Sequence, residues 1–291
     1  MVTRRAFVGA ALSAAAAAAG CAHARHSAAP LTPGQANGWS PYGFPPPAGG
    51  GPTLTGGAGP PVVVLHEILG RTANTFALGD RLRTAGFQVY LPRLFGKEGG
   101  EGFLGAYFKS CGSRQFNCAA GARSSPIVDW IAALCEDVGA KTRSRVGVIG
   151  MCLTGAFPLA ALRVEAVVAP VLCQPTIPFG LFWLGEATRL GLSDAEVRTA
   201  RERRSVPILG MRFTQDSRCP ASRFAVLSEL FGARFQAIEI PSGVTHPGGH
   251  HISARAHSVL GSWYDHTPGH PTRAAFDRMV GFLRAQLGEG S

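Results

Sequence analysis

Residues 146–155 read Val-Gly-Val-Ile-Gly-Met-Cys-Leu-Thr-Gly, and this stretch decides the fold of the chain. The run from Val146 to Ile149 is short and apolar, which is typical of a strand buried on both faces. A helix-like stretch, residues 156–162, follows. Between the two, Gly150-Met-Cys152 matches the start of a nucleophile elbow, G-x-S-x-G, with cysteine in place of serine. Such an elbow holds its nucleophile at the N-terminus of the next helix, where the helix field favours a thiolate.

The elbow departs from the general pattern at one position, because Thr154 replaces the second glycine and Gly155 follows it. Neighbouring positions must be small so that strand and helix can pack closely. The alternative is a buried cysteine in a tight strand-to-helix turn. The strand before and the helix after favour the catalytic interpretation, in which Cys152 is the nucleophile and the backbone N–H of Leu153 binds an oxyanion.

Outside the elbow, short apolar runs alternate with amphipathic stretches. We expect strands at 62–65, 87–91, 146–149, 166–172, 206–211 and 235–240, and helices at 72–85, 125–138, from 193 onward and at 271–287. Hydrophobic residues make up 46% of the 291 and charged residues 16%, which favours a large buried core over disorder. The alternation predicts a mostly parallel sheet with helices on both faces, whose chemistry lies on loops beyond the carboxyl ends of the strands.

A thiol nucleophile needs a base within hydrogen-bond reach and a third group that orients the base. In α/β hydrolases the chain order is nucleophile, acid, histidine. After Cys152, Asp216 is the clear acid at the carboxyl end of a strand, although aspartate also suits a turn or a helix cap. Six histidines follow the last expected strand, where the base belongs: His246, His250, His251, His257, His266 and His270.

Three motifs, in this order and spacing, resemble the dienelactone hydrolase family of α/β hydrolases. They are Val-Leu-His-Glu67-Ile68-Leu-Gly70, Gly150-Met-Cys152-Leu-Thr-Gly155 and Ala256-His257-Ser-Val-Leu260, and Gln215-Asp216-Ser-Arg-Cys-Pro220 adds a fourth. The similarity covers roughly residues 60–288. It implies an α/β-hydrolase fold and cleavage of an ester or lactone through a Cys-His-Asp triad and a cysteinyl acyl-enzyme.

The resemblance assigns the base to His257, because this histidine alone lies in the His-Ser-Val-Leu motif. His250 and His251 are adjacent in a glycine-rich loop, and we expect them to be loop or rim residues. A different class of function would use His246, His250, His251 and His257 as zinc ligands. The glycines of this loop fix no geometry for a metal, so we expect no metal and no cofactor.

Glu67 follows the first strand and is expected in the same cleft, where a carboxylate must be paired or hydrogen-bonded. The resemblance implies that Glu67 helps to deprotonate the thiol when substrate arrives. It also implies that the N–H of Ile68 is the second oxyanion donor. The alternative for Glu67 is a loop carboxylate that pairs with an arginine such as Arg71.

The best-known members of the family hold a substrate carboxylate with arginines. Arg114, in Ser-Arg-Gln-Phe116, is a candidate for this role. The family's arginine shortly after the catalytic histidine is absent, because Gly261 follows Leu260, and Arg255 is the candidate substitute. We expect a small-molecule ester or lactone as substrate, and these arginines would suit an anionic one.

The first 21 residues are typical of an export signal. Arg4 and Arg5, with Phe7 two residues on, resemble a Tat signal, and an alanine-rich run follows. The end of the run, Ala-Ala-Gly-Cys21, resembles a bacterial lipobox with Ala18 in the usual leucine position. We expect export to the periplasm or the outer face of the membrane, with attachment through a lipidated Cys21. A catalytically inactive, anchored binding protein is the third class of function that these features allow.

Residues 22–60 are rich in Pro, Gly, Ala and Ser, so we interpret them as a linker before a hydrolase domain at 61–291. Trp39, Tyr42 and Phe44 are exceptions, and we expect them to dock on the body of the protein. Seven cysteines is an odd number, and a bridge between Cys111 and Cys118 stays open.

The formal net charge of +10 predicts a basic surface. The chain lacks a Lys/Arg run and a basic stripe interleaved with aromatic residues. We therefore expect no nucleic-acid partner, and a role for the charge in attracting anionic substrates.

Overall fold

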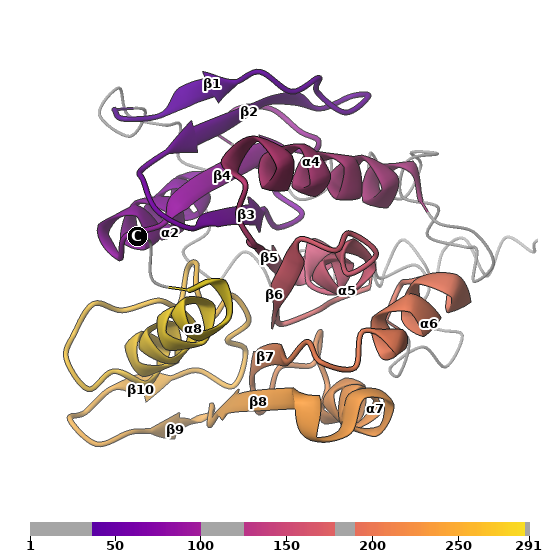
Figure 1. The fold of residues 1–291 in the computed structure, drawn as a ribbon. Helices are drawn as coiled ribbons and strands as arrows, with labels where there is room; N and C mark the ends of the chain where they lie inside the picture. The colour runs from indigo at the N-terminus through magenta and orange to yellow at the C-terminus, as the bar shows by residue number, and fades with distance from the viewer. Residues whose placement is uncertain (1–36, 100–124, 178–189, 289–291) are drawn as a thin grey trace, which may run out of the picture.

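The computed structural model describes residues 37–99, 125–177 and 190–288. An eight-stranded sheet with the order β1-β2-β4-β3-β5-β6-β7-β8 forms its centre (Figure 1). The strands are β1 (Ser40–Tyr42), β2 (Gly51–Gly56), β3 (Pro61–Leu65), β4 (Gln88–Arg93), β5 (Val146–Met151), β6 (Val167–Cys173), β7 (Ile208–Phe213) and β8 (Phe235–Ile240). Neighbours from β4 to β8 are parallel, and β1 and β2 are antiparallel additions at one edge.

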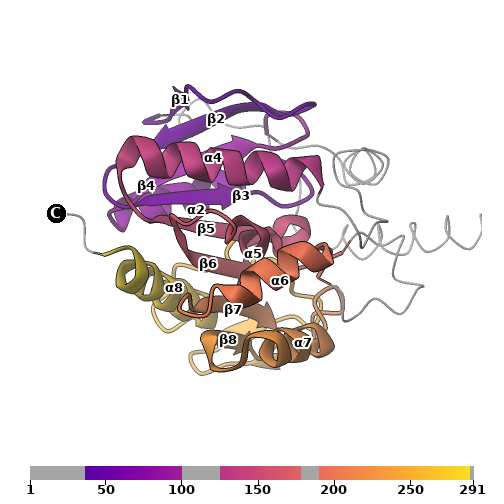
Figure 2. The same ribbon diagram turned by 45° about the vertical axis from the view of Figure 1, so that its right-hand side comes forward.

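Helices cover both faces of the sheet, as predicted (Figures 1 and 2). One face carries α2 (Ala73–Thr84) and α8 (Pro271–Leu287), and the other carries α4 (Pro126–Thr142), α5 (Phe157–Ala161), α6 (Asp194–Glu202) and α7 (Ala221–Phe231). Among the described residues, two 3₁₀ turns, η2 (Cys152–Thr154) and η5 (Gly232–Arg234), and a small hairpin of β9 (Val244–Thr245) and β10 (His251–Ile252) complete the elements. The predicted class of fold is therefore confirmed.

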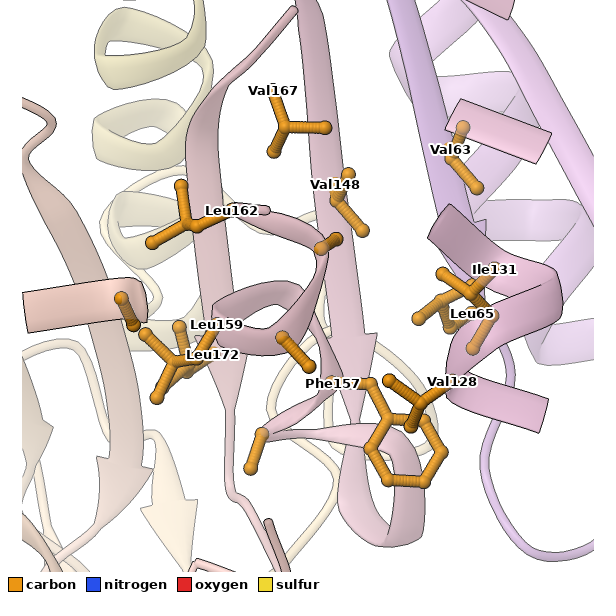
Figure 3. Close-up of a cluster of buried hydrophobic side chains, with 14 of the residues drawn as sticks. Val63, Leu65, Val128, Ile131, Val148, Phe157, Leu159, Leu162, Val167 and Leu172 are labelled. Atoms are coloured by element: carbon orange, nitrogen blue, oxygen red, sulfur yellow. The ribbon is translucent and has the colours of Figure 1, made fainter. Parts of the chain in front are cut away.

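The strand that carries the elbow lies in the middle of the sheet and is buried along its whole length. Its side chains pack with those of β3, β6, α4 and α5, as Figure 3 shows for Val63, Leu65, Val128, Ile131, Val148, Phe157, Leu159, Leu162, Val167 and Leu172. Burying each such side chain contributes about 1.5–3 kcal/mol. This packing fixes the point at which β5 ends and the elbow begins.

The structure corrects the predicted linker at its C-terminal end, because β1 and β2 extend the sheet within residues 22–60. Aromatic side chains hold this segment. The ring of Trp39 packs edge-on against Phe76, with ring centroids 5.9 Å apart. The hydroxyl of Tyr42 donates a 2.6 Å hydrogen bond to Asp137. Composition alone did not show that aromatic side chains and the open edge of β4 would order this segment. The expectation that Trp39, Tyr42 and Phe44 dock on the body of the protein is confirmed.

The predicted export signal and Cys21 lie outside the described residues, as do Cys111, Cys118 and Arg114. In the ranges that the structure describes, no helix is both long enough and apolar enough to cross a membrane.

Candidate active site

Cys152 lies directly beyond the end of β5, at the first position of η2. Its φ of 55° is in the left-handed region, which a side chain with a Cβ rarely adopts. Such a backbone costs about 1–3 kcal/mol and persists where its surroundings fix it. One fixing contact is the 2.8 Å hydrogen bond from the N–H of Gly155 to the carbonyl of Cys152. A strained cysteine at this point has the geometry of a nucleophile elbow.

Two glycines allow strand and helix to meet at the elbow. A Cβ on Gly150 would overlap the carbonyl oxygen of Thr154, and a Cβ on Gly155 would lie 2.5 Å from the Cα of Pro175. Neither neighbour is a flexible side-chain end, so neither can move aside cheaply. The small-residue requirement read from the sequence therefore has a direct cause in backbone contacts.

Thr154, the departure from the general motif, has its own function in the turn. Its fully buried hydroxyl accepts a 3.1 Å hydrogen bond from the N–H of Met151. The same oxygen lies 3.1 Å from the carbonyl of His66, to which it can donate. Thr154 thus ties the elbow to the end of the neighbouring strand β3.

Asp216 and His257 come together as a buried pair. Asp216 lies three residues beyond the end of β7, and its Oδ2 accepts a 2.6 Å hydrogen bond from Nδ1 of His257. The other ring nitrogen, Nε2, is buried and has no hydrogen-bond partner among the described residues. It is therefore the nitrogen that is available to take a proton.

Burial and the neighbouring charges act in opposite directions on the pKa values of this pair. Burial alone lowers the pKa of His257, but Asp216 and then Cys152 raise it, with a net rise to about 9. Burial alone raises the pKa of Asp216, but His257 and Arg218 outweigh it and hold this pKa below its usual value. The influence of Cys152 on His257 indicates that the thiol and the imidazole lie in one electrostatic environment.

Arginines fix the loop that carries Asp216. The N–H of Arg218 donates a 3.0 Å hydrogen bond to Oδ1 of Asp216. Arg223 is fully buried and donates to the carbonyls of Arg218 and Pro175, at 2.9 and 2.7 Å. These contacts join the loop after β7 to the loop after β6, so the carboxylate cannot turn away from His257 without breaking them.

Glu67 follows β3 and is half-buried. The alternative in which it pairs with Arg71 is wrong, because Arg71 forms a two-bond ion pair with Glu98 at 3.0 and 2.6 Å. Among the described residues, the side-chain partner of Glu67 is Gln174, whose Nε2 donates a 3.1 Å hydrogen bond to Oε1.

His66 fixes the chain beside Glu67, a role that its sequence pattern did not indicate. The ring is fully buried, and burial lowers its pKa to about 4, so it is neutral. Nε2 accepts from the N–H of Leu94 at 3.0 Å, and Nδ1 donates to the carbonyl of Glu67 at 2.8 Å. The two contacts use both ring nitrogens in a single tautomer.

The two expected oxyanion donors follow adjacent strand ends. Leu65 of β3 pairs in register with Gly150 of β5. Leu153 comes three residues after Gly150 and Ile68 three residues after Leu65. The carboxyl ends of β3 and β5 therefore bring both backbone positions to the same edge of the sheet.

Among the described residues, the other candidates from the sequence form no hydrogen bond with Asp216 or His257. Arg255 is exposed, two residues before His257. Nε2 of His246 donates to the carbonyl of Pro241 at 2.8 Å, and Nδ1 of His251 lies 3.3 Å from the hydroxyl of Thr245. In the parts of the chain that the structure describes, no group of three or more His, Cys, Asp or Glu residues is placed to hold a metal ion.

Comparison with solved structures gives the fold of the protein. A dienelactone hydrolase from Anabaena variabilis matches with a TM-score of 0.54 at 15% identity, over 86% of this chain and 100% of that chain. A cold-adapted esterase from an Arctic intertidal metagenomic library matches with a TM-score of 0.52 at 13% identity, over 81% and 88%. At such identities the likeness shows the fold, which is that of the α/β hydrolases. The comparison with curated proteins gave no match.

The model of the dienelactone hydrolase family matches residues 51–262, and the chain belongs to this family. By class the protein is therefore a hydrolase of carboxylic esters or lactones. The match also begins in β2, within the stretch that composition alone had assigned to a linker.

Proposed function

We propose that the protein cleaves a small-molecule ester or lactone through the triad of Cys152, His257 and Asp216. The observation that carries the proposal is the buried 2.6 Å hydrogen bond between His257 and Asp216, with Nε2 of His257 unpaired among the described residues. A cysteine with strained backbone at the end of β5 supports the choice of nucleophile.

In the first half of the reaction, Sγ of Cys152 attacks the carbonyl carbon of the substrate. Glu67 accepts the thiol proton as substrate binds, while His257, whose pKa of about 9 keeps it protonated at neutral pH, holds a proton on Nε2. The N–H groups of Leu153 and Ile68 stabilise the oxyanion of the tetrahedral intermediate. When the intermediate collapses, the bond to the leaving oxygen breaks and His257 donates its Nε2 proton to that oxygen. A thioester on Cys152 remains, and in a lactone the released hydroxyl stays attached to the acyl group.

In the second half, His257 removes a proton from water, and the hydroxide attacks the thioester carbonyl. Collapse breaks the carbon–sulfur bond and releases the carboxylic acid, the sulfur recovers its proton from Glu67, and His257 keeps the proton taken from water. Asp216 stabilises the imidazolium in both halves, which is consistent with the raised pKa of His257.

An anionic acyl group is the substrate chemistry that we favour. The chain has a net charge of +10, and Arg114 and Arg255 are the candidate partners of a substrate carboxylate. Matched neutral and carboxylated esters would test this point. Wild type should have a higher kcat/KM for the carboxylated ester than for the neutral one, and the value for the carboxylated ester should fall by about tenfold in Arg114→Gln or Arg255→Gln. Equal kcat/KM values for the two esters in wild type would contradict this preference.

Turnover by matched cysteine variants tests the mechanism. On a panel of p-nitrophenyl esters and lactones, Cys152→Ala should lose at least about a thousandfold in kcat. Cys135→Ala is the control, because Cys135 is a buried free cysteine on α4. Activity of Cys152→Ala within about threefold of wild type would overturn the nucleophile assignment. Turnover of no substrate by wild type would favour the inactive binding protein.

We also propose that the chain is exported and attached to the membrane through Cys21. The support is the sequence of the leader, with Arg4, Arg5 and the lipobox-like end of the alanine run. Replacing both arginines by lysine should leave the precursor in the cytoplasm, measured by cell fractionation. Wild-type protein found mainly as unprocessed cytoplasmic chain would contradict export.

A further inference from the structure

Gln174 is the first residue after β6 and is fully buried. Its φ of 34° is in the left-handed region, which is unusual for a residue with a side chain. Backbone contacts maintain this conformation. Its N–H donates to the carbonyl of Met211 at 2.7 Å, and its own carbonyl accepts from the hydroxyl of Thr176 at 3.0 Å. A buried, strained polar residue at the carboxyl end of a central strand is typical of a functional site.

The side chain of Gln174 joins two loops of the candidate site. Nε2 donates to Oε1 of Glu67 at 3.1 Å, and Oε1 of Gln174 accepts from the N–H of Val259 at 3.4 Å. Only one orientation of the amide satisfies both contacts, because a carboxylate accepts and a backbone N–H donates. Val259 is two residues from His257, so the amide connects Glu67 to the loop of the base.

The backbone beside Gln174 contacts the nucleophile. The N–H of Thr176 donates a 2.9 Å hydrogen bond to the carbonyl of Cys152. Pro175 is the residue that closes the space above Gly155. Residues 174–176 therefore contact the elbow, Glu67 and the loop of His257 together.

The chemistry of the contact suits a proton acceptor. The partner of Glu67 is an amide, which is neutral, and Arg71 is occupied by Glu98. An arginine on Glu67 would add a full positive charge that opposes protonation of the carboxylate. The amide fixes the direction of one oxygen without that charge, and the other oxygen, for which the described residues provide no hydrogen bond, can accept a proton.

From this geometry we propose that Gln174 is a positioning residue, which holds Glu67 and the His257 loop in the arrangement required for deprotonation of Cys152. This inference rests on the proposed function and adds to it the residue that couples two of its parts. Gln174 acts through Glu67 and Val259 and does not itself exchange a proton.

A double-mutant cycle tests the coupling. Gln174→Met keeps the length of the side chain and removes both hydrogen bonds. On one p-nitrophenyl ester it should lower kcat by about tenfold or more, with KM within about threefold. In a Glu67→Gln background the same substitution should change kcat by less than about threefold, because the residue through which it acts is gone. If the loss of kcat in the double variant equals the product of the losses in the two single variants, Gln174 acts independently of Glu67 and supports the fold only. That result would overturn the proposal.

An exchange of the two side chains keeps the test informative if Gln174→Met folds poorly. Gln174→Glu retains an acceptor for Val259 but places a second carboxylate against Glu67. Its Tm should fall, and adding Glu67→Gln should restore the Tm, because an amide then faces a carboxylate again. The double variant should remain as slow as Glu67→Gln alone. Failure to restore the Tm would contradict the contact.

Alkylation of Cys152 separates this proposal from the proposed function, since it requires no turnover. The rate of modification by iodoacetamide is followed on the Cys152 peptide by mass spectrometry. Gln174→Met should slow it by about tenfold, and in a Glu67→Gln background by less than about threefold. If wild type cleaves no ester yet this cycle is coupled, the proposed function fails and the role of Gln174 stands. If wild type cleaves esters but the effects of Gln174→Met and Glu67→Gln are independent in both the kcat cycle and the alkylation cycle, only the role of Gln174 fails.

Discussion

Asp216→Asn removes the charge that faces His257 and keeps the shape of the side chain. In wild type both side chains are buried and 2.6 Å separates Nδ1 from Oδ2. Burial lowers the pKa of His257, but Asp216 and Cys152 raise it from 6.5 to about 9. At 1.36 kcal/mol for each pKa unit, the surroundings favour imidazolium over imidazole by about 3 kcal/mol.

The raised pKa gives the stability of the protein a definite dependence on pH. Between 6.5 and about 9 the folded protein keeps a proton on His257 that the unfolded chain has released. This stabilisation is complete below 6.5 and is lost as the pH rises through about 9. The lowered pKa of Asp216 affects stability at acidic pH. Its contribution is present above pH 3.8 and is lost as the pH falls through the pKa of Asp216 in the folded protein, which is lower than 3.8. The contribution of His257 to the free energy of unfolding should therefore fall by about 3 kcal/mol from about pH 6 to about pH 10. The buried thiols of Cys135, Cys173 and Cys219, whose pKa values are raised from 9.0 by burial, lower the stability further at the upper end in wild type and variant alike.

In Asp216→Asn most of the contribution from His257 should disappear, because burial then dominates and holds the pKa of His257 down, so the total fall in stability should be smaller than in wild type. Urea unfolding followed by tryptophan fluorescence measures the difference at the two pH values. Asp277→Asn is the matched control, since Asp277 is exposed on α8 and the change in charge is the same. Asp216→Asn should also lower kcat by about 10²–10⁴, because an amide no longer holds the imidazole of His257 in the required tautomer. An equal fall in stability for wild type and Asp216→Asn would refute the role of the pair.

Three further substitutions have expected outcomes. His257→Ala should lower kcat by at least about a thousandfold with little change in KM, while His250→Ala stays within about tenfold; an indispensable His250 would show that the wrong histidine was chosen. Thr154→Val leaves the buried N–H of Met151 without its acceptor and should lower the free energy of unfolding by about 1–3 kcal/mol, whereas Thr154→Ser should cost less. Trp39→Ala should lower the free energy of unfolding by about 3–5 kcal/mol, because the packing of β1 and its neighbours depends on this ring. A change below about 0.5 kcal/mol would show that residues 40–56 contribute no more to stability than a linker.

Local patterns predicted the elbow and the class of fold. A β-branched run, small residues and a helix-like stretch are features of contiguous residues, so residues 146–162 could be read without knowledge of the rest. The same approach failed for residues 40–56, where composition indicated a linker. That segment is ordered by Phe76, Tyr90 and Asp137, which lie far from it in sequence. Composition could not reveal that β4 presents an unpaired edge.

Long-range contacts decided the rest of the candidate site. His257 and Asp216 are 41 positions apart, and Gln174 is 107 positions from Glu67. No periodicity connects such residues, and the sequence selected His257 through a family motif rather than through geometry. Gln174 could have been suspected from its place after a central strand, but its partner could not. Parallel strands bring their carboxyl ends to one edge of the sheet, so the sequence determines which side chains reach that edge. Which of them come within hydrogen-bond distance depends on the conformations of the loops, and these are fixed only when the buried arginines, Thr154 and the strained turns pack together.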